Sequence, residues 1–212
     1  SAVHNVPDAS ILTMTEFFTA ASNMANACEI PVIADCDTGY GDATNVRYMT
    51  KKYESAGIAG ICIEDKTFPK QNSLLEGGNN QLLSEKEFSA KILAANEAKQ
   101  NDDFTIIARI EALISGIGMK EALKRADAYE QAGADLILIH SKQITPEEIF
   151  EFADSWKGTA PLVVIPTTYY SVNVDELIKH KIKMVIYANQ TLRAAHLALS
   201  NLLTEMKDAN NM

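Results

Sequence analysis

Short apolar runs rich in β-branched residues alternate along the chain with longer segments in which apolar residues recur at helical spacing. Continuously apolar runs in such an alternation are typical of a parallel sheet covered by helices. The expected strands are 30–35, 58–63, 105–110, 135–140, 161–165 and 183–188. The expected helices are 13–27, 44–55, 85–99, 118–131, 146–156, 173–180 and 190 to about 206. The pattern predicts one α/β domain of β-α repeats.

One segment, 64–83, breaks this alternation because it is long and irregular. A connection of that length in a compact domain usually forms a functional lid or is disordered. We predict that residues 66–82 are the most mobile internal segment when no ligand is bound. The segment carries four polar side chains suited to holding an anion, namely Lys66, Lys70, Asn72 and Ser73.

Composition narrows the class of protein. Hydrophobic residues make up 47% of the 212 residues and charged residues 22%, which are ordinary values for a soluble globular chain. The net charge of −9 argues against a nucleic-acid surface, and no apolar run approaches the ~20 residues of a membrane span. The first residues lack the pattern of a signal peptide, and Cys28, Cys36 and Cys62 lack metal spacing. These features predict a cytoplasmic protein with reduced thiols and no nucleic-acid or membrane partner.

The most informative motif runs from Asp35 to Gly41, directly after the first expected strand. Side chains alternate along a strand, so Asp35 and Asp37 are expected on one face and Cys36 on the other. Two neighbouring carboxylates repel each other, and a hard cation such as Mg²⁺ relieves that repulsion. The alternative to a metal site is a polar strand end beside a Gly-rich turn with no ligand. Because two acids lie on one face, the metal site is favoured.

Polar residues also follow the other expected strands. They are Glu64 and Asp65, Arg109 and Glu111, His140 and Ser141, Pro166 and Thr167, and Asn189. The carboxyl edge of parallel β/α folds is where ligands bind. Arg109 and Glu111 could also form a buried ion pair with a purely structural role, and a single His could be a core residue whose hydrogen bonds are all made. Because the pattern repeats at the same edge on several strands, a ligand-binding site is favoured.

The combination indicates a reaction type. Asp35, Asp37 and Glu64 can hold a hydrated metal, directly or through water. Arg109 can grip a carboxylate or phosphoryl group, and Lys70 can add charge when the loop closes. Metal, Arg and Lys together suit the transfer of a phosphoryl group. A dinucleotide loop is disfavoured because the third Gly is missing and the acids repel a pyrophosphate.

These residues resemble the phosphoenolpyruvate mutase family, within the isocitrate lyase and phosphoenolpyruvate mutase superfamily. The resemblance spans essentially the whole chain. Its motifs are Asp35–Gly41, Glu64–Leu74 (E-D-K-T-F-P-K-Q-N-S-L), Ala108–Ala112 and Ile139–Lys142. It implies a TIM-type (β/α)₈ barrel in homodimers or homotetramers, with a C-terminal helix, here about 190–206, exchanged between subunits. It also implies interconversion of phosphoenolpyruvate and phosphonopyruvate with Mg²⁺.

The resemblance assigns roles to individual residues. Asp35 would bind Mg²⁺ directly, while Asp8, Asp37 and Glu64 would hold its waters. Arg109 would bind the phosphoryl end of the substrate, with His140 nearby. Lys70 and Asn72 would be lid residues that act in catalysis. Ser73, Gly39 and Tyr40 would complete the substrate-binding set.

The sequence also departs from its relatives. Isocitrate lyase-type relatives carry a catalytic Cys in the loop that here holds residues 68–72, which counts against C–C cleavage. Phosphonopyruvate hydrolase tends to have Thr in place of Asn72. Six expected strands instead of eight predict a barrel that lacks the first two βα units, with the outer edges of strands 30–35 and 183–188 unpaired. We therefore expect an N-terminal portion to precede Ser1 in the natural protein.

Three readings follow from these observations. The first is a phosphoenolpyruvate mutase, an isomerase of phosphonate biosynthesis that acts on a small anionic substrate. The second is phosphonopyruvate hydrolase, in which water captures the phosphoryl group. The third, from another class, is a non-catalytic fragment that binds a metal or a partner.

Overall fold

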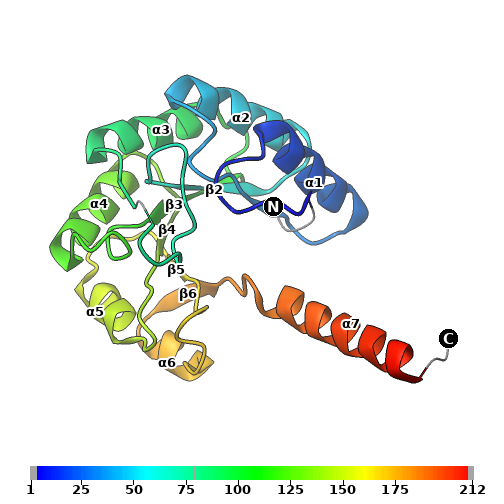
Figure 1. Ribbon diagram of the computed structural model, residues 1–212. Coiled ribbons are helices and arrows are strands. Elements are labelled where there is room, and N and C mark those ends of the chain that lie inside the picture. The colour runs from blue at the N-terminus through cyan, green and yellow to red at the C-terminus, as the bar shows by residue number, and fades with distance from the viewer. Residues whose placement is uncertain (1–3, 79, 210–212) are drawn as a thin grey trace.

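The computed structural model describes residues 4–78 and 80–209. One sheet of six parallel strands follows the order of the sequence. The strands are β1 (Ile33–Asp35), β2 (Gly60–Glu64), β3 (Thr105–Ile110), β4 (Leu136–Ile139), β5 (Leu162–Val164) and β6 (Ile182–Val185). The sheet curls into an open half-barrel with the helices outside it (Figure 1). The predicted TIM-type fold with six of the eight βα units is confirmed.

The helices agree with the expected segments to within a few residues. They are α1 (Met14–Ala27), α2 (Ala43–Ser55), α3 (Glu85–Ala98), α4 (Met119–Gln131), α5 (Glu147–Ser155), α6 (Val174–Lys179) and α7 (Gln190–Ala209). Side chains cap the starts of several: Asp42 accepts from the backbone of Thr44 and Asn45, and Ser84 accepts from Glu87. Such caps satisfy amide groups that have no partner inside the helix.

The first and last strands each have one partner among the described residues. β1 pairs only with β2, and β6 pairs only with β5, so no ladder joins them. The prediction of two unpaired strand edges is confirmed. β1 begins at Ile33, three residues later than expected, since Pro31 has no amide hydrogen to donate.

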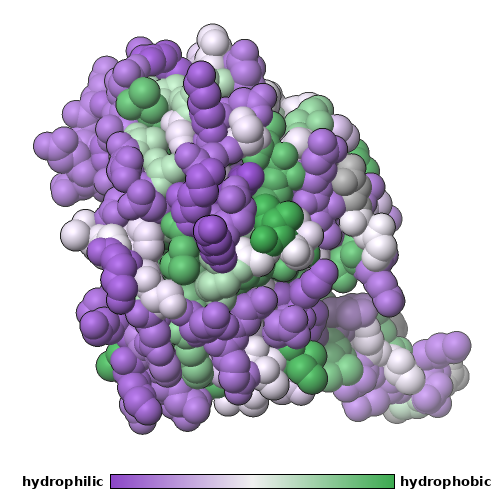
Figure 2. All heavy atoms as spheres, turned by 90° about the vertical axis from the view of Figure 1, so that its left-hand side faces the viewer, coloured by the Kyte–Doolittle hydropathy of each residue, from purple (hydrophilic) through white to green (hydrophobic). Residues whose placement is uncertain are grey.

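The main core lies between the sheet and the surrounding helices. It contains fully buried residues such as Met49, Ile61, Phe88 and Phe152. A smaller apolar cluster, with Ile107, Leu138 and Val163, lies on the other side of the strands. Seen from outside, the helical surface is largely hydrophilic with isolated apolar patches (Figure 2). Burial of the two apolar layers fixes the strands, so their carboxyl ends lie at one edge.

The last helix, α7, differs from the others because none of its described residues is buried. It extends away from the half-barrel in Figure 1. Several of its leucines are more than half exposed, namely Leu192, Leu197, Leu199, Leu202 and Leu203. Among the described residues, no helix combines the length and the apolar character needed to cross a membrane.

Candidate active site

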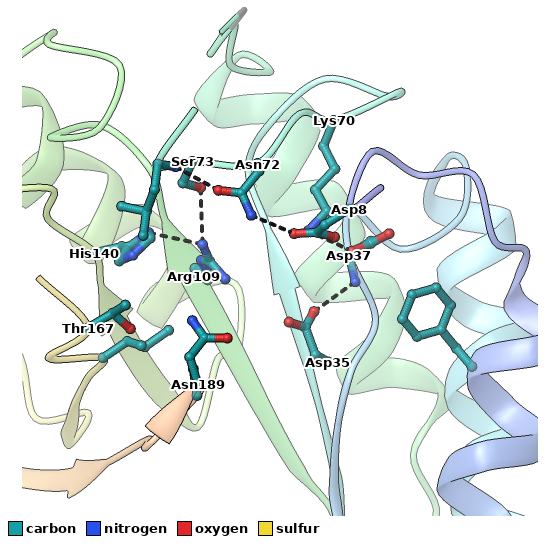
Figure 3. A pocket seen from close by; sticks show the side chains of 14 residues that line it. Asp8, Asp35, Asp37, Lys70, Asn72, Ser73, Arg109, His140, Thr167 and Asn189 are labelled. Carbon is teal, nitrogen blue, oxygen red and sulfur yellow. Dashed lines mark hydrogen bonds and ion pairs between the residues drawn. The ribbon is translucent and has the colours of Figure 1, made fainter. Parts of the chain in front are cut away.

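A cavity of about 280 Å³ lies at the carboxyl ends of the strands. Figure 3 shows side chains from β1, the segment 64–83, β3 and the turns after β4, β5 and β6 pointing into it. Eight of the eleven site residues expected from the sequence line this cavity. They are Asp8, Asp35, Asp37, Lys70, Asn72, Ser73, Arg109 and His140.

The turn after β1 presents two of the acids. β1 ends at Asp35, and Asp37 follows in a left-handed conformation with φ of 50°. The amide of Asp37 donates to Asp35 Oδ1 at 3.0 Å, which folds the turn back on itself. Cys36 between them is fully buried in the core. The expected facing is confirmed, although Asp37 owes its direction to the turn rather than to strand alternation.

Two contacts hold this turn in place from behind. Gly39 has φ of +88°, and a Cβ there would lie 2.5 Å from Val46 Cγ2, so only Gly fits. Lys91 of α3 donates its ammonium group to the carbonyl oxygen of buried Thr38 at 2.8 Å. Burial lowers the pKa of Lys91, while nearby acids oppose that shift. The turn is therefore fixed by a steric fit and by a charged hydrogen bond.

The acids are bridged by a lysine from the irregular segment. Lys70 Nζ lies 2.8 Å from Asp37 Oδ1 and 3.1 Å from Asp8 Oδ1. Asn72 Nδ2 donates to Asp8 Oδ2 at 3.1 Å, and the amide of Lys70 donates to Ser10 Oγ. Burial raises the pKa of Asp8, but Lys70 and Asn72 outweigh it, and the pKa lies below its usual value. The 64–83 segment thus covers the acids and neutralises part of their charge.

Arg109 stands on the opposite side of the cavity, within a buried network. Its Nε lies 2.5 Å from Glu111 Oε1, and its Nη2 lies 2.9 Å from His140 Nδ1. Ser73 Oγ accepts from Arg109 Nη2 at 3.2 Å and donates to Glu111 Oε2 at 2.6 Å. Although burial opposes it, the positive charge of Arg109 holds the pKa of Glu111 well below its usual value. The guanidinium group is therefore permanently charged and fixed in direction.

His140 follows β4 and is buried beside both charges. Its Nδ1 lies 2.8 Å from Glu111 Oε1. Burial lowers its pKa, and Arg109 adds to that effect, while Glu111 opposes it. His140 is consequently neutral at physiological pH.

Glu64 ends β2 and is almost completely buried, but it does not line the cavity. Its nearest cations are Arg109 Nε at 3.5 Å and Lys66 Nζ at 4.0 Å. Neither of its carboxylate oxygens makes a hydrogen bond with the described residues. Burial raises its pKa above the usual value. Two orphaned buried oxygens are costly, so Glu64 is a group that a water or cation would satisfy.

The described residues do not contain three His, Cys, Asp or Glu side chains arranged as a metal-binding group. The oxygen donors are nevertheless of the kind that Mg²⁺ takes, and Asp8, Asp35 and Asp37 share one cavity. Lys70 stands between two of them as a cation already in place. The residues fit a metal once the ammonium group of Lys70 moves aside. The magnesium assignment remains a prediction.

Two residues of the 64–83 segment, Lys66 and Asp65, do not lie where the sequence analysis expected. The expectation that Lys66 holds an anion is wrong, since its buried ammonium donates to Gln71 O and Ser73 Oγ. Asp65 points away from the cavity and accepts from Arg125 Nη1 at 2.9 Å and from Tyr129 at 2.8 Å. Alternation along β2 explains this, because neighbours on a strand face opposite sides.

Gly39 and Tyr40 lie behind the cavity wall rather than in its lining. Tyr40 has φ of 58°, and its ring lies 5.7 Å from the ring of Phe17. Phe17 of α1 does line the cavity, and sequence reasoning missed it. An aromatic residue on the apolar side of a helix is indistinguishable by pattern from a core residue.

The base of the 64–83 segment is closed by backbone contacts. Lys66 and Leu82 form an isolated antiparallel bridge, and the amide of Thr67 donates to Gln81 O at 2.9 Å. Between these ends the segment reaches over the cavity to Asp8. We call residues 66–78 the lid; Asn79, also within the predicted mobile stretch, lies outside the described residues. Predicted lid mobility remains a prediction.

The cavity thus presents a fixed cation on one side and three carboxylates on the other, under a polar lid. This arrangement can bind a small anion at Arg109 and a cation at the acids. It can also close both away from water through Lys70 and Asn72.

Comparison with known proteins identifies the family. Residues 1–207 match the family model described as phosphoenolpyruvate phosphomutase. The chain is 49% identical over 196 residues to phosphonopyruvate hydrolase of Variovorax sp. (strain Pal2), covering 92% of this chain and 68% of that protein. It is 45% identical over 194 residues to phosphoenolpyruvate phosphomutase of Tetrahymena pyriformis, covering 92% of this chain and 65% of that protein. The chain therefore spans about two thirds of the length of these relatives.

Solved structures agree with this result. The crystal structure of phosphoenolpyruvate phosphomutase from Streptomyces platensis subsp. rosaceus superimposes with a TM-score of 0.97 at 48% identity, covering 100% of this chain and 73% of that one. Phosphonopyruvate hydrolase in complex with oxalate and Mg²⁺ superimposes with a TM-score of 0.92 at 44% identity, covering 100% of this chain and 72% of that one. The chain belongs to the phosphoenolpyruvate phosphomutase family, within the phosphoenolpyruvate mutase and isocitrate lyase superfamily of enzymes.

Proposed function

We propose that this chain forms the active site of a Mg²⁺-dependent phosphoenolpyruvate mutase. The reaction breaks the bond between phosphorus and the enol oxygen and forms a bond between phosphorus and C3, giving phosphonopyruvate without loss or gain of atoms. The observation that carries the proposal is the placement of Arg109 opposite Asp8, Asp35 and Asp37 around one small cavity. A volume of about 280 Å³ suits a ligand with a three-carbon skeleton.

Asp35 is proposed to bind the metal directly, with Asp8, Asp37 and Glu64 holding its waters. A bound Mg²⁺ would neutralise negative charge on the carboxylate end of the substrate. The exposed Asp35, the shared cavity and the orphaned oxygens of Glu64 support this assignment. One relative, phosphonopyruvate hydrolase, has been crystallised with oxalate and Mg²⁺.

Arg109 is proposed to bind the phosphoryl group as it moves. Its position is set by Glu111, so little reorganisation is needed when charge shifts on the phosphoryl oxygens. Neutral His140 beside it can accept or donate a hydrogen bond at the same group. Ser73 contacts Arg109 and completes this side of the substrate pocket, while Gly39 and Tyr40 act by fixing the turn after β1.

The lid is proposed to exclude water from the transferring group. Lys70 and Asn72 reach across the cavity to the acids, and Asn72 Oδ1 also accepts from the amide of Leu74, which stiffens the tip. Retention of the phosphoryl group by the organic fragment requires that no water competes for it. We expect Asn72 to contribute to mutase rather than hydrolase chemistry.

Phosphorus NMR of phosphonopyruvate incubated with enzyme and Mg²⁺ tests the proposal. Phosphoenolpyruvate as the product supports the mutase. Inorganic phosphate with pyruvate supports the hydrolase, which the 49% identity to the Variovorax protein makes the second candidate. An unchanged phosphonopyruvate signal supports the non-catalytic alternative.

We also propose that α7 is exchanged between subunits of a homodimer or homotetramer. A helix with five exposed leucines is poorly stable alone in water, so a second copy is a suitable partner. Light scattering of the Leu199→Glu/Leu203→Glu variant tests this. We expect the molar mass of the variant assembly to be lower than that of the parent assembly; equal molar masses would contradict the exchange.

The free thiols of Cys28, Cys36 and Cys62 support a cytoplasmic location.

A further inference from the structure

A second cavity, of about 510 Å³, lies at the opposite end of the strands from the candidate active site. Leu162, the first residue of β5, and Lys181, which directly precedes β6, both line it. Its wall also includes the loop 156–161, which joins α5 to β5. The cavity is therefore at the amino edge of the sheet, whereas the site residues described above lie at the carboxyl edge.

The loop 156–161 is held firmly. Glu130 of α4 accepts from the amide and hydroxyl of Thr159 at 2.6 and 2.7 Å and from the amide of Ala160 at 2.6 Å. Trp156 Nε1 donates to Ala160 O at 3.1 Å. Gly158 packs against the Trp156 ring with no space for a Cβ. Because the loop is already held by these contacts, binding of a ligand does not incur the entropy cost of ordering it.

The lining carries three exposed positive charges, two of them unpaired. Lys157, Lys181 and Lys183 line the cavity in a chain whose net charge is −9. Lys157 Nζ donates to the backbone carbonyl of Asp154 at 3.4 Å, whereas within residues 4–78 and 80–209 the ammonium groups of Lys181 and Lys183 have no hydrogen bond or ion pair. The one lining carboxylate, Asp154, accepts from His180 Nδ1 at 2.9 Å instead. The local charge is therefore opposite to that of the whole chain.

The backbone at Lys181 is a further unusual feature. Lys181 has φ of 60°, in the left-handed region that Gly or Asn usually occupies at the end of a helix. Residues in sparsely populated conformations cluster at binding sites, where the surrounding structure enforces them. Here the conformation places a Lys, rather than a Gly, beside the cavity that Lys183 also lines.

We propose that this cavity binds a small phosphate compound that carries at least two negative charges. Ammonium groups bind phosphate oxygens as point charges, and three of them match a multiply charged anion. A volume of about 510 Å³ accommodates a pyrophosphate or a phosphate ester, with the Trp156 ring forming one wall. The site is independent of the proposed mutase reaction, since it shares no residue with the catalytic cavity.

The chain contains one Trp, so Trp156 fluorescence reports on this cavity alone. The experiment titrates the protein with sodium pyrophosphate at constant pH and ionic strength. We expect a saturable change in Trp156 emission. The Lys181→Gln/Lys183→Gln variant should bind about tenfold more weakly, because it loses two charged contacts. The Lys70→Met variant, which alters the catalytic cavity, should keep the parent response.

Lys179→Gln serves as the matched control, because Lys179 ends α6 close to the two lysines but does not line the cavity. Its binding curve should equal that of the parent. Circular dichroism confirms that each variant is folded before it is titrated. A parent protein without a saturable change would overturn the proposal, as would a double variant that binds as tightly as the parent.

Discussion

The two sides of the candidate active site are built differently. On one side Arg109, in β3, makes contacts to Glu111, His140 and Ser73 that are all buried. On the other side Asp8, Asp35 and Asp37 belong to an N-terminal segment, a strand end and a turn. Asp8 and Asp37 meet through Lys70 of the lid, and the side chain of Asp8 is 38% exposed. We call these the arginine side and the acidic side.

The difference indicates which side is ready before a ligand arrives. The arginine side has its counter-charge built in, since Glu111 lies against the guanidinium group. The acidic side has more negative charge than its own residues neutralise, so it depends on a cation from elsewhere. In the structure Lys70 is that cation. We infer that the arginine side is permanent and that the acidic side can exchange the ammonium group for a metal.

Replacing Arg109 with Met is expected to have the largest effect. It removes the phosphoryl-binding group, so activity should fall by about 10³-fold or more. It also leaves Glu111 and Glu64 without their main counter-charge, which should cost about 3 kcal/mol of stability. Activity assays and urea unfolding measure the two effects. The double variant Arg109→Met/Glu111→Gln should recover part of the stability but no activity; an Arg109→Met protein as stable as the parent would break the comparison.

Replacing Asp35 with Ala should separate function from stability. Turnover and high-affinity Mg²⁺ binding should be lost, because the proposed direct metal ligand is gone. Stability should fall by about 1 kcal/mol or less, because the amide of Asp37 loses its acceptor at Asp35 Oδ1 while removal of the charge relieves repulsion between the acids. Calorimetric Mg²⁺ titration and urea unfolding check this, with Asp102→Ala as a surface control. Full activity after exhaustive chelation of the parent would show that the metal assignment is wrong.

Sequence reasoning succeeded where strand geometry controls position. The order of six strands and the convergence of Asp35, Asp37, Arg109 and His140 follow from parallel strands that end at one edge. The resemblance, rather than the pattern, supplied Asp8, because a segment outside the sheet has no periodicity to place it. The same limit explains Lys66 and Phe17: a buried cation and an aromatic wall depend on tertiary packing that spacing does not encode.

Replacing Asn72 with Thr tests the lid on the acidic side. The shorter side chain loses the hydrogen bond to Asp8, so the lid should close less tightly. Mutase activity should fall by about tenfold, the effect of one lost charged hydrogen bond, and phosphate release should rise. Phosphorus NMR gives both products in one experiment. An unchanged rate and product ratio would remove Asn72 from the water-excluding role.

The smallest predicted effect is the change in the free energy of unfolding with pH, which tests the arginine side. Burial, with Arg109, lowers the pKa of His140, so below pH 6.5 the unfolded chain takes up this proton more readily than the folded chain. The His140 contribution to stability should therefore fall as the pH drops below 6.5, by no more than about 1.4 kcal/mol per pH unit for one proton, while Glu64, whose pKa burial raises to about 7, contributes with the opposite sign. Urea unfolding from pH 7.5 to 5.5 measures it. Because Glu64 is present in both proteins, the difference isolates His140: His140→Gln should gain stability relative to the parent as the pH falls, and identical slopes would contradict a depressed pKa.

The exchange of Lys70 for a metal is the central claim, and calorimetric titration of Mg²⁺ into the Lys70→Met variant tests it most directly. The ammonium group lies within 3.1 Å of Asp8 and 2.8 Å of Asp37, so its removal should free the acids for the metal. We predict that Mg²⁺ binds about tenfold more tightly to Lys70→Met than to the parent, a gain of about 1.4 kcal/mol, although activity falls. Lys120→Met, on the exposed side of α4, should bind Mg²⁺ as the parent does. Equal or weaker binding by Lys70→Met would contradict the exchange.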